Sequence, residues 1–452
     1  MLLPDKFKDM MTDMLGDDSQ RFSSCCDEKP YRGIRVNTLK VTADDLLPML
    51  DFKVRPSPFC KEGYYVEDEV TGIGNSPLHH AGAFYVQEPS ASSAVEAMGI
   101  EEGDFVLDLC AAPGGKSTQI AAKLSGTGFL WSNEFVTQRT KGLISNTERL
   151  GVTNAAVSSA RPDVLCKVLK GAFDKVLVDA PCSGEGMFRK EPKALENWSL
   201  ENSISCGDRQ LHILDSAAEA VGGGGLLCYS TCTFSYYENE RVIEAFLGKH
   251  RDFSLIEPSI EFGVGGFKKY APSVADIGYT RRIFPFSGGE GHFVALMRKE
   301  GDRERRFPEL SNRCDNKAAE SAFCSFAEET FGKLPEGKTM ILGDKVYITP
   351  IIPDAAGSGI IRTGVLCGEL KGNRFEPSHA LFSAFGGSAA QREDLTLDDP
   401  RLNAFLRGEE IDCNSSFKGY TAVTVNGIPL SFGKASQGRL KNHYPKGLRL
   451  LK

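Results

Sequence analysis

The sequence predicts an α/β fold in which a parallel sheet carries helices on both faces. Between about residues 100 and 300, short β-branched apolar runs alternate with segments of helical spacing, a pattern typical of parallel strands buried on both sides. Three of these runs end in segments rich in glycine, cysteine or acid, as expected where α/β proteins bind ligands. The expected strands are 105–109, 128–133, 155–158, 175–179, 225–230 and 292–298, and the expected helices are 117–124, 137–150, 208–221 and 236–247.

The length of 452 residues exceeds one ordinary core and indicates roughly three units. We place the α/β core at 96–300, after a small N-terminal α/β domain at 1–95 in which no catalytic constellation is evident. A linker and a small C-terminal subdomain are expected at 301–390, and an α+β module at 391–452.

Local signals support this division of the C-terminal part. The charged stretch 298–306 indicates a linker. The dipeptides Gly386-Gly387 and Asn426-Gly427 predict tight turns that join short strands.

Composition narrows the class of protein. Hydrophobic residues make up 41% of the chain and charged residues 25%, as in soluble globular proteins. No apolar run reaches the roughly 18 residues that cross a bilayer, and the first residues do not resemble a signal peptide. We therefore expect a cytoplasmic protein without membrane association, and nothing demands more than a monomer. The 13 cysteines form no C-x-x-C pair, which favours reduced thiols and predicts no metal site.

The formal net charge of -7 argues against a protein that binds nucleic acid simply by being basic. Residues 433–452, however, contain no acid and interleave basic residues with His443 and Tyr444. This composition is typical of an RNA-contacting surface, although a solvated tail is the simpler interpretation. The basic residues are Lys434, Arg439, Lys441, Lys446, Arg449 and Lys452.

A glycine-containing turn follows the first strand of the core. Asp108 closes that strand and Pro113-Gly114-Gly115 opens the next helix, which directs backbone N–H groups toward a ligand. A phosphate-binding loop would need a glycine at Cys110, and a G-x-G-x-x-G motif is absent. Glu134 follows the second strand, where an acid can accept hydrogen bonds from a ribose diol. A ribose-binding acid without a phosphate cradle indicates S-adenosylmethionine, against the alternative of an ordinary turn and a surface glutamate.

Two cysteines lie where predicted strands end. Cys182 follows the strand that ends in Asp179, and Cys232 stands between a strand and the helix 236–247. A thiol attacks only as thiolate, and the positive end of a helix favours that form. Their positions favour chemistry over burial as small apolar residues. A Cys-His hydrolase is the competing class, but none of the seven histidines lies in a recognisable partner motif.

Three ordered motifs stand out together: Asp108-Leu109-Cys110-Ala111-Ala112-Pro113-Gly114-Gly115-Lys116, Asp179-Ala180-Pro181-Cys182-Ser183-Gly184-Glu185-Gly186 and Ser230-Thr231-Cys232-Thr233. These motifs resemble those of the RNA 5-methylcytosine methyltransferases of the Nop/Sun type. The likeness extends to residues 35–40, 85–91 and 284–292, and residues 440–449 are similar to the PUA-like module of the bacterial RsmF-like branch. The resemblance implies a Rossmann-like class I S-adenosylmethionine-dependent core, an N-terminal RNA-binding domain and a PUA-like RNA-binding module. It also implies 16S ribosomal RNA, or the small ribosomal subunit, as partner.

The resemblance implies catalytic roles for three residues. Cys232 would add to C6 of cytosine, which makes C5 nucleophilic toward the cofactor's methyl group. Asp179 would bind N3 and the amino edge of the base and stabilise charge that develops during addition. Cys182 would act in removal of the C5 proton, as a base or through one. Lys190 lies close enough in sequence to help hold RNA, although a solvated lysine is the simpler interpretation.

The resemblance also implies the cofactor contacts. Residues 110–116 would line the methionine and ribose region, Glu134 would bind the ribose, and Asp179 would border the cofactor. Arg139 matches a basic position of the following helix. Ser159 stands where many relatives have an acid or an amide that reads adenine's amino group, so this position departs from the family pattern.

Two alternatives remain at this point. A transfer RNA cytosine-C5 methyltransferase would keep the chemistry and change the substrate. A noncatalytic ribosome-assembly factor would bind RNA and S-adenosylmethionine without turnover, which the intact Asp179, Cys182 and Cys232 disfavour.

Overall fold

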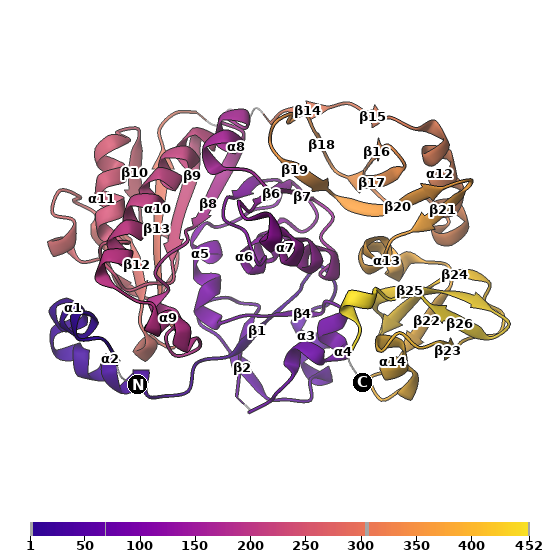
Figure 1. Cartoon of the computed structure of the whole chain (residues 1–452), viewed down its shortest axis with the longest axis horizontal. Coiled ribbons are helices and arrows are strands. Elements are labelled where there is room, and N and C mark those ends of the chain that lie inside the picture. Colours follow the sequence, from indigo (N-terminus) through magenta and orange to yellow (C-terminus); the bar gives the residue numbers. More distant parts are fainter. Residues whose placement is uncertain (1–2, 68, 303–306, 451–452) are drawn as a thin grey trace.

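The computed structural model describes residues 3–67, 69–302 and 307–450 (Figure 1). A ten-stranded sheet at its centre has the order β11-β12-β13-β9-β8-β5-β6-β7-β19, with β10 beside β13. The central strands are parallel from β7 to β9. Their bounds are β5 Phe105–Asp108, β6 Phe129–Asn133, β7 Ala155–Ser158, β8 Phe173–Asp179, β9 Val221–Thr231 and β13 His292–Lys299, and the smaller strands are β10 Phe253–Ile256, β11 Val264–Gly265, β12 Arg281–Ile283 and β19 Ile360–Thr363.

Helices cover both faces of this sheet. Successive strand residues point to opposite faces, so Val106 and Leu177 join one apolar core while Leu107 and Val176 join another. One face carries α5 Ser93–Ala97, α6 Gly115–Leu124 and α7 Thr137–Arg149, and the other carries α8 Pro162–Val168, α10 Leu200–Ala220 and α11 Glu240–Lys249. The short α9 Pro192–Glu196 precedes α10.

The expected elements of the core are confirmed, but the sheet is mixed rather than parallel. Each of the six expected strands and four expected helices has a counterpart. The difference arises at the two ends of the sheet. β13 lies between β12 and β9 and runs antiparallel to both, and β19 pairs antiparallel with β7, with Ile360 opposite Ser158. A strand from the C-terminal region thus covers the edge that β7 would otherwise expose.

The N-terminal part contributes to two cores. Its four-stranded sheet has the order β2-β3-β1-β4, and its first helices pack against the core, where the rings of Phe7 and Phe22 contact Phe234. The bounds are α1 Asp5–Leu15, α2 Ser19–Cys26, β1 Gly33–Val36, α3 Ala43–Leu46, β2 Val54–Pro56, β3 Gly63–Val66, α4 Pro77–His80 and β4 Phe84–Val86.

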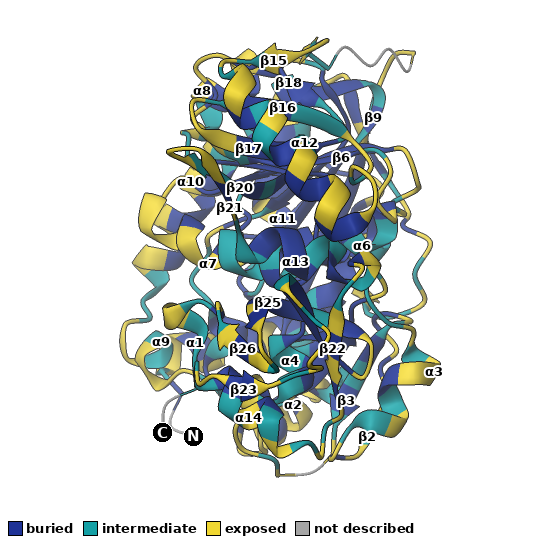
Figure 2. Ribbon diagram, turned by 90° about the vertical axis from the view of Figure 1, so that its right-hand side faces the viewer, coloured by how far each residue is buried: buried dark blue, intermediate teal, exposed yellow. Residues whose placement is uncertain are grey.

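The C-terminal part forms two smaller units beside the core (Figure 1). The first holds β14 Glu309–Leu310, β15 Arg313–Cys314, α12 Lys317–Phe331, β16 Lys338–Leu342, β17 Lys345–Thr349, β18 Ile352–Pro353, β20 Val365–Lys371, β21 Arg374–Pro377 and α13 His379–Phe385. Buried and exposed residues alternate along α12 (Figure 2). Residues 303–306 of the expected linker lie outside the described residues.

The last unit holds β22 Arg392–Leu395, α14 Pro400–Leu406, β23 Ile411–Asp412, β24 Gly419–Val425, β25 Ile428–Ser436 and β26 Arg439–Asn442. Its apolar residues share one core with the N-terminal sheet. The tight turn expected at Asn426-Gly427 is confirmed between β24 and β25. The turn expected at Gly386-Gly387 is wrong, because these residues start a short 3-10 helix after α13.

The basic C-terminal segment is less available to RNA than its composition predicts. Tyr444 is 2% exposed, and its hydroxyl bonds Nδ1 of His80 at 2.7 Å. Arg439 pairs with Glu410 at 2.8 Å and with Asp412 at 2.6 Å. The expectation that this segment offers stackable rings and free cations to RNA is therefore wrong for Tyr444, which is buried, and for Arg439, which is paired. Lys452 lies outside the described residues.

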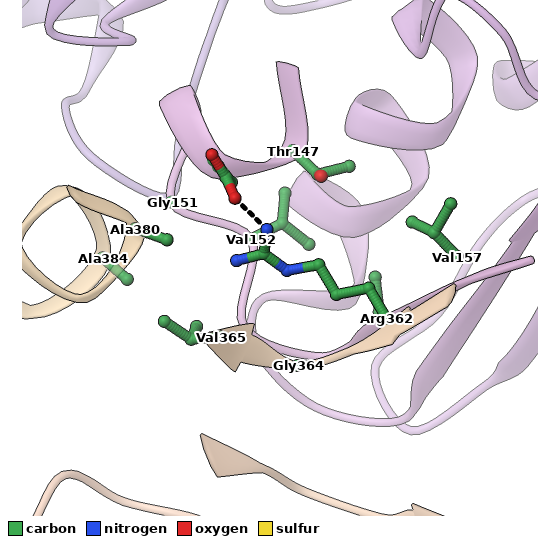
Figure 3. A pocket seen from close by; sticks show the side chains of 11 residues that line it. Thr147, Gly151, Val152, Val157, Arg362, Gly364, Val365, Ala380 and Ala384 are labelled. Carbon is green, nitrogen blue, oxygen red and sulfur yellow. Dashed lines mark hydrogen bonds and ion pairs between the residues drawn. The ribbon is translucent and has the colours of Figure 1, made fainter. Parts of the chain in front are cut away.

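A small cavity lies where the C-terminal part meets the core (Figure 3). Thr147 and Val152 line it from α7 and the following loop, and Arg362, Val365 and Ala380 line it from the other side. The guanidinium of Arg362 pairs with the carboxylate of Glu148 across this seam. Among the described residues, no helix is both long and apolar enough to cross a membrane.

Candidate active site

The two cysteines with predicted catalytic roles meet at one edge of the sheet. β8 and β9 are parallel neighbours with Asp179 opposite Ser230, so the loops that follow them leave the sheet side by side. Sγ of Cys182 in the first loop lies 3.3 Å from Sγ of Cys232 in the second. This contact and burial raise the pKa of Cys182 well above its ordinary value, which keeps that sulfur a thiol.

Two buried carboxylates join these loops reciprocally. Glu185, in the first loop, accepts a 2.9 Å hydrogen bond from the backbone N–H of Phe234 in the second. Glu238, beyond the second loop, accepts one of 2.9 Å from the backbone N–H of Ser183 in the first. Each carboxylate is at most 1% exposed. The two carboxylates and the two backbone N–H groups that they bind hold the loops together. These four groups, rather than the thiols themselves, fix the separation of the two sulfurs.

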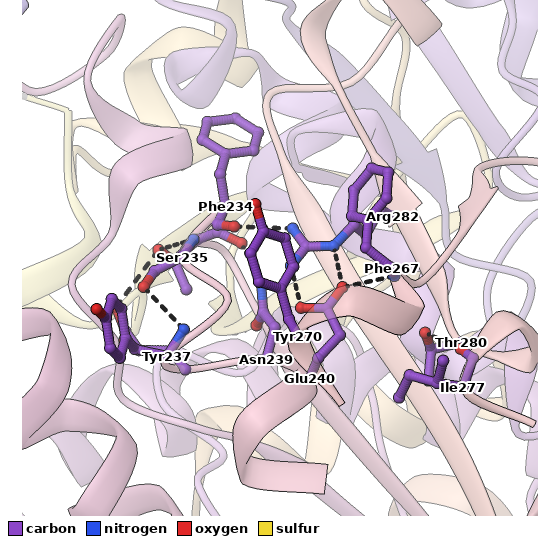
Figure 4. Close-up of polar contacts among 12 residues, drawn as sticks. Phe234, Ser235, Tyr237, Asn239, Glu240, Phe267, Tyr270, Ile277, Thr280 and Arg282 are labelled. Carbon is purple, nitrogen blue, oxygen red and sulfur yellow. Dashed lines mark hydrogen bonds and ion pairs between the residues drawn. The ribbon is translucent and has the colours of Figure 1, made fainter. Parts of the chain in front are cut away.

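A buried arginine also holds the loop of Cys232 (Figure 4). Nη1 of Arg282, on β12, donates a 2.8 Å hydrogen bond to the carbonyl of Phe234. The same guanidinium forms a bidentate pair with Glu240 at the start of α11, and both side chains are at most 2% exposed. A bidentate Arg–carboxylate pair has a fixed geometry, so it fixes the position of the loop carbonyl.

Asp179 lies beside the thiols with both carboxylate oxygens engaged. Lys116 donates to Oδ2 at 2.7 Å and the Ser230 hydroxyl donates to Oδ1 at 2.7 Å. Burial alone would raise the pKa of Asp179, but the ammonium of Lys116 and these hydrogen bonds outweigh it and hold the pKa below its ordinary value. Asp179 is therefore an ionised acceptor at neutral pH.

The loop 110–116 surrounds the N-terminal end of α6, as expected for a cofactor loop. Gly114 has a φ of +111°, a conformation that L side chains rarely adopt. Neighbouring side chains hold the loop by its carbonyls, because Arg139 donates to Ala112 O and Asn146 to Pro113 O, each at 2.9 Å. Burial raises the pKa of Cys110 well above its ordinary value, so this third motif cysteine is a thiol that lines the loop rather than a nucleophile.

One buried atom at this loop has no partner and fits a cationic cofactor. Asp108 is fully buried, and its Oδ2 accepts a 2.6 Å hydrogen bond from Ser117. Its Oδ1 is buried without a hydrogen-bond partner among the described residues. Burial and the charge of Asp179 raise the pKa of Asp108 to about 7. An ammonium or sulfonium group would supply the missing compensation, and S-adenosylmethionine carries both.

The predicted ribose acid is already partly engaged. Oε1 of Glu134 accepts a 2.8 Å hydrogen bond from the backbone N–H of Val136, and Oε2 pairs with Arg139 at 3.1 Å. A carboxylate offers about four acceptor positions, so a ribose diol can still bind there. Arg139 thus links Glu134 to the loop 110–116.

The predicted adenine end contains a feature that the sequence reasoning missed. The Ser159 hydroxyl lies 2.9 Å from that of Thr137, and its backbone N–H donates to Gly359 O of the C-terminal part at 2.9 Å. Phe135, next to Glu134, is 60% exposed. An exposed aromatic residue directly after the predicted ribose acid is the signal that could have indicated a surface for a flat ring.

The N-terminal part contacts the site, which the sequence alone did not indicate. Nη1 of Arg35 donates to Gly115 O and Nη2 to Thr118 Oγ1, each at 2.8 Å. Ser90 lies 2.8 Å from Nδ1 of His292 and 2.7 Å from Glu88. Sequence reasoning did not connect these residues, although they fall in the motif segments 35–40, 85–91 and 284–292. Lys190 is half-buried, and burial lowers its pKa.

Comparison with known proteins gives a consistent family assignment. The family described as 16S rRNA methyltransferase RsmB/F matches residues 95–298. The N-terminal domain of 16S rRNA methyltransferase RsmF matches 3–89, the RsmF rRNA methyltransferase first C-terminal domain matches 325–385, and the methyltransferase RsmF PUA domain matches 392–450.

Relatives and solved structures agree. The ribosomal RNA small subunit methyltransferase F of Klebsiella pneumoniae is 32% identical over 450 residues, covering 94% of this chain and 92% of that one. The protein of the same name from Vibrio parahaemolyticus is 32% identical over 475 residues, covering 99% and 97%. A methyltransferase homologue from Pyrococcus horikoshii superposes with a TM-score of 0.59 at 28% identity, covering 65% of this chain and 94% of that one. NSun6 from the same organism, solved with SFG, has a TM-score of 0.59 at 22% identity, covering 66% and 99%, and shares the fold.

With relatives that are 32% identical over nearly its whole length, the chain belongs to the 16S rRNA methyltransferase RsmB/F family.

Proposed function

We propose that the chain methylates C5 of cytosine in 16S ribosomal RNA through a covalent bond between Cys232 and C6 of the base. The single observation that carries this proposal is the 3.3 Å contact between the sulfurs of Cys182 and Cys232, beside an Asp179 that Lys116 holds ionised. One thiol attacks, the second is within reach of the adduct, and the acid can bind the base that both must contact.

In the first step the Cys232 thiol gives up its proton, which ends on N3 of the ring, and its sulfur bonds C6. The electrons of the C5=C6 double bond move to C5, which becomes nucleophilic. Asp179 accepts a hydrogen bond from the 4-amino group and, once N3 has taken up the proton, from N3–H, which stabilises the protonated ring as the sulfur adds. S-adenosylmethionine, when bound, supplies an electrophilic methyl group that C5 attacks. Residues 110–116, Asp108, Glu134, Arg139 and Ser159 would hold it.

In the second step the proton on C5 must leave before the bond to Cys232 can break. Cys182 would direct this step, because its sulfur contacts the sulfur that bears the adduct. Its raised pKa supports a thiol that relays a proton toward water or another base, rather than a free thiolate. The electron pair of the C5–H bond then reforms C5=C6 and expels Cys232 as a thiolate, which takes back the proton from N3.

Ribosomal RNA as the substrate rests on the family and on the names of the relatives. The N-terminal domain at 1–95 and the PUA-like module at 391–452 would select the RNA, with the catalytic domain at 96–300 and the subdomain at 301–390 between them. A shared apolar core joins the first and last of these units, which supports one continuous RNA-binding side. We propose that the enzyme acts as a monomer in the cytoplasm, where ribosomes assemble.

The test is transfer of labelled methyl from S-adenosylmethionine to unmodified small subunits, free ribosomal RNA and transfer RNA, followed by bisulfite mapping. We expect one or a few protected cytidines in 16S ribosomal RNA, and no label with the Cys232→Ala variant. Label in transfer RNA alone would keep the chemistry and overturn the substrate. Binding of RNA and cofactor without transfer to any of these RNAs would favour the assembly-factor alternative.

A further inference from the structure

A chain of three polar side chains leads from the N-terminal part into the active site. Ser90 donates its backbone N–H to Oε1 of Glu88 at 2.9 Å and its hydroxyl to Oε2 at 2.7 Å. The Ser90 hydroxyl also lies 2.8 Å from Nδ1 of His292. The His292 side chain is 6% exposed, and its Nε2 has no hydrogen-bond partner among the described residues.

This chain of bonds fixes the tautomer of His292. A serine hydroxyl has one proton to donate, and Ser90 gives it to Glu88. Oγ of Ser90 must therefore accept from Nδ1–H of His292, which leaves Nε2 with a free lone pair. The hydrogen bond from Ser90 to Glu88 thus makes Nε2 of His292 a hydrogen-bond acceptor.

The imidazole stays neutral in this position. Burial lowers the pKa of His292 to about 4. The positive charges of Lys116 and Lys190 act in the same direction, and the negative charges of Glu88 and Asp179 act against it. At neutral pH the ring is therefore an acceptor through Nε2 and a poor base.

The strand pairing places His292 at the same end of the sheet as the attacking cysteine. β13 and β9 are antiparallel, with Phe293 opposite Thr231. His292 is the first residue of β13, and Cys232 directly follows β9. Asp179, which ends β8 on the other side of β9, and Lys116 both act electrostatically on His292. His292 therefore lies within reach of the charged groups of the site.

We propose that His292 is a specificity-determining residue of the methyl transfer, whose Nε2 accepts a hydrogen bond from the 4-amino group of the target cytosine. The inference rests on the proposed function and deepens it. The 4-amino group is the only N–H donor of the neutral cytosine base, and its two protons allow both Asp179 and Nε2 of His292 to accept from it. Uracil carries an oxygen at this position, so its lone pairs would face the lone pair of Nε2. The site would then reject uracil because two acceptors meet without a proton between them.

The test is a cycle that combines a change in the enzyme with a change in the substrate. The enzyme change is His292→Phe, which keeps an aromatic ring of similar size and removes both nitrogens. The substrate is a ribosomal RNA fragment that contains the cytidine found by bisulfite mapping, made once with cytosine and once with pyrimidin-2-one, which lacks the amino group. The readouts are kcat/KM for methyl transfer and the rate of covalent adduct formation.

We expect His292→Phe to lower kcat/KM on the cytosine fragment about tenfold, as for loss of a buried hydrogen bond. On the pyrimidin-2-one fragment the same change should alter the rate of adduct formation less than twofold, because the group that His292 contacts is already missing. Equal losses on both fragments would overturn the proposal. In that case a fragment with 2′-deoxycytidine at the target identifies whether Nε2 contacts the ribose hydroxyl instead.

Three controls separate this role from a structural one. His212→Phe, an exposed histidine on α10, should leave both substrates unaffected. Ser90→Ala, which removes the contact that fixes the tautomer, should give a smaller loss with the same dependence on the amino group. His292→Gln can place an amide oxygen near the position of Nε2. Compared with His292→Phe, it should recover part of the activity on the cytosine fragment and leave the rate on the pyrimidin-2-one fragment unchanged. Absence of methyl transfer by the wild-type protein would instead count against the proposed function itself.

Discussion

Sγ of Cys182 lies 3.3 Å from Sγ of Cys232, and the reciprocal hydrogen bonds of Glu185 and Glu238 hold the two loops at that spacing. This spacing supports the proposal that Cys232 attacks the base and that Cys182 acts in the release step. We therefore predict that Cys182→Ala accumulates a covalent protein–RNA adduct, because addition and methylation proceed while loss of the C5 proton slows.

Denaturing electrophoresis with labelled RNA measures this adduct. The double variant Cys182→Ala/Cys232→Ala should show none, and Cys232→Ala alone should abolish transfer while S-adenosylmethionine still binds. Cys206→Ala is a matched control, because Cys206 is a buried cysteine of α10 that lies in neither loop. An adduct that persists without Cys232 would contradict the assignment of the nucleophile.

Lys116 keeps Asp179 ionised. The charge of Lys116 should therefore set the lowest pH at which the enzyme stays active. Without the ammonium, burial of Asp179 is less opposed and its pKa rises. We predict that Lys116→Met lowers kcat at pH 7 by about 10²-fold, as for loss of one preorganised electrostatic contact. The activity lost at low pH should also extend to higher pH than in the wild type.

The pH dependence of kcat at saturating cofactor measures this effect. Lys116→Arg retains the charge and should retain most of the wild-type pH profile, although the shape of its head group differs. A Lys116→Met profile that falls in height without moving along the pH axis would show that Lys116 acts on substrate or cofactor alone.

Asp108 should make cofactor binding depend on pH. Its pKa of about 7 lies above the ordinary 3.8, so the apoprotein holds part of its Asp108 protonated at neutral pH. A cationic ligand against the unpartnered Oδ1 favours the ionised form. We predict that S-adenosylmethionine binds more tightly as the pH rises from about 6 to 8 and that binding releases a proton.

Isothermal titration in buffers of different ionisation enthalpy measures the released proton. Asp108→Asn should weaken binding by roughly 10- to 100-fold, as for a hydrogen bond to a charged group, and should remove the pH dependence. The sign for stability is opposite. An acid whose pKa is raised in the folded state destabilises the fold as the pH rises from 3.8 through about 7. The contribution of Asp108 should therefore make the apoprotein less stable at pH 8 than at pH 6.

The local parts of the fold could be predicted from the sequence. Strand and helix patterns in the core repeat over a few residues, and the motifs around Cys110, Cys182 and Cys232 follow strands directly, so their meeting at one sheet edge follows from topology. Long-range pairings could not be predicted in this way. Ser90 and His292 are far apart in the sequence, and no local pattern indicates that a serine and a histidine share a hydrogen bond.

The same limit explains the misjudged C-terminal region. Composition predicted an accessible Tyr444. The residue is buried instead, and one of its contacts is His80 of the N-terminal part. Likewise, β19 continues the sheet beside β7 through pairs such as Ile360 with Ser158. An exposed sheet edge can accept any strand of compatible pattern, so its partner is set by tertiary packing that a single sequence does not display.

The seam between α7 and β19 provides a test of this docking. The Arg362 side chain is 11% exposed, and its ion-pair partner across the seam is Glu148 of α7 (Figure 3). Burial lowers the pKa of Arg362 to about 10, a sign that the guanidinium lies in a poorly solvated place. Removing only the partner leaves this charge buried and uncompensated, which typically costs roughly 3–5 kcal/mol. Glu148 remains 25% exposed, so we predict a loss near the lower end of that range for Glu148→Ala.

The double variant Glu148→Ala/Arg362→Met should recover much of this stability, because it removes the unpaired charge and keeps an apolar side chain of similar length in the cavity. Urea denaturation followed by tryptophan fluorescence measures both variants, since Trp131 lies on β6 beside β7. If the single and the double variant were equally destabilised, packing across the seam rather than the ion pair would hold β19 against the core. Because Ser159 bonds Gly359 at the same seam, the single variant should also raise KM for S-adenosylmethionine, and the double variant should restore it.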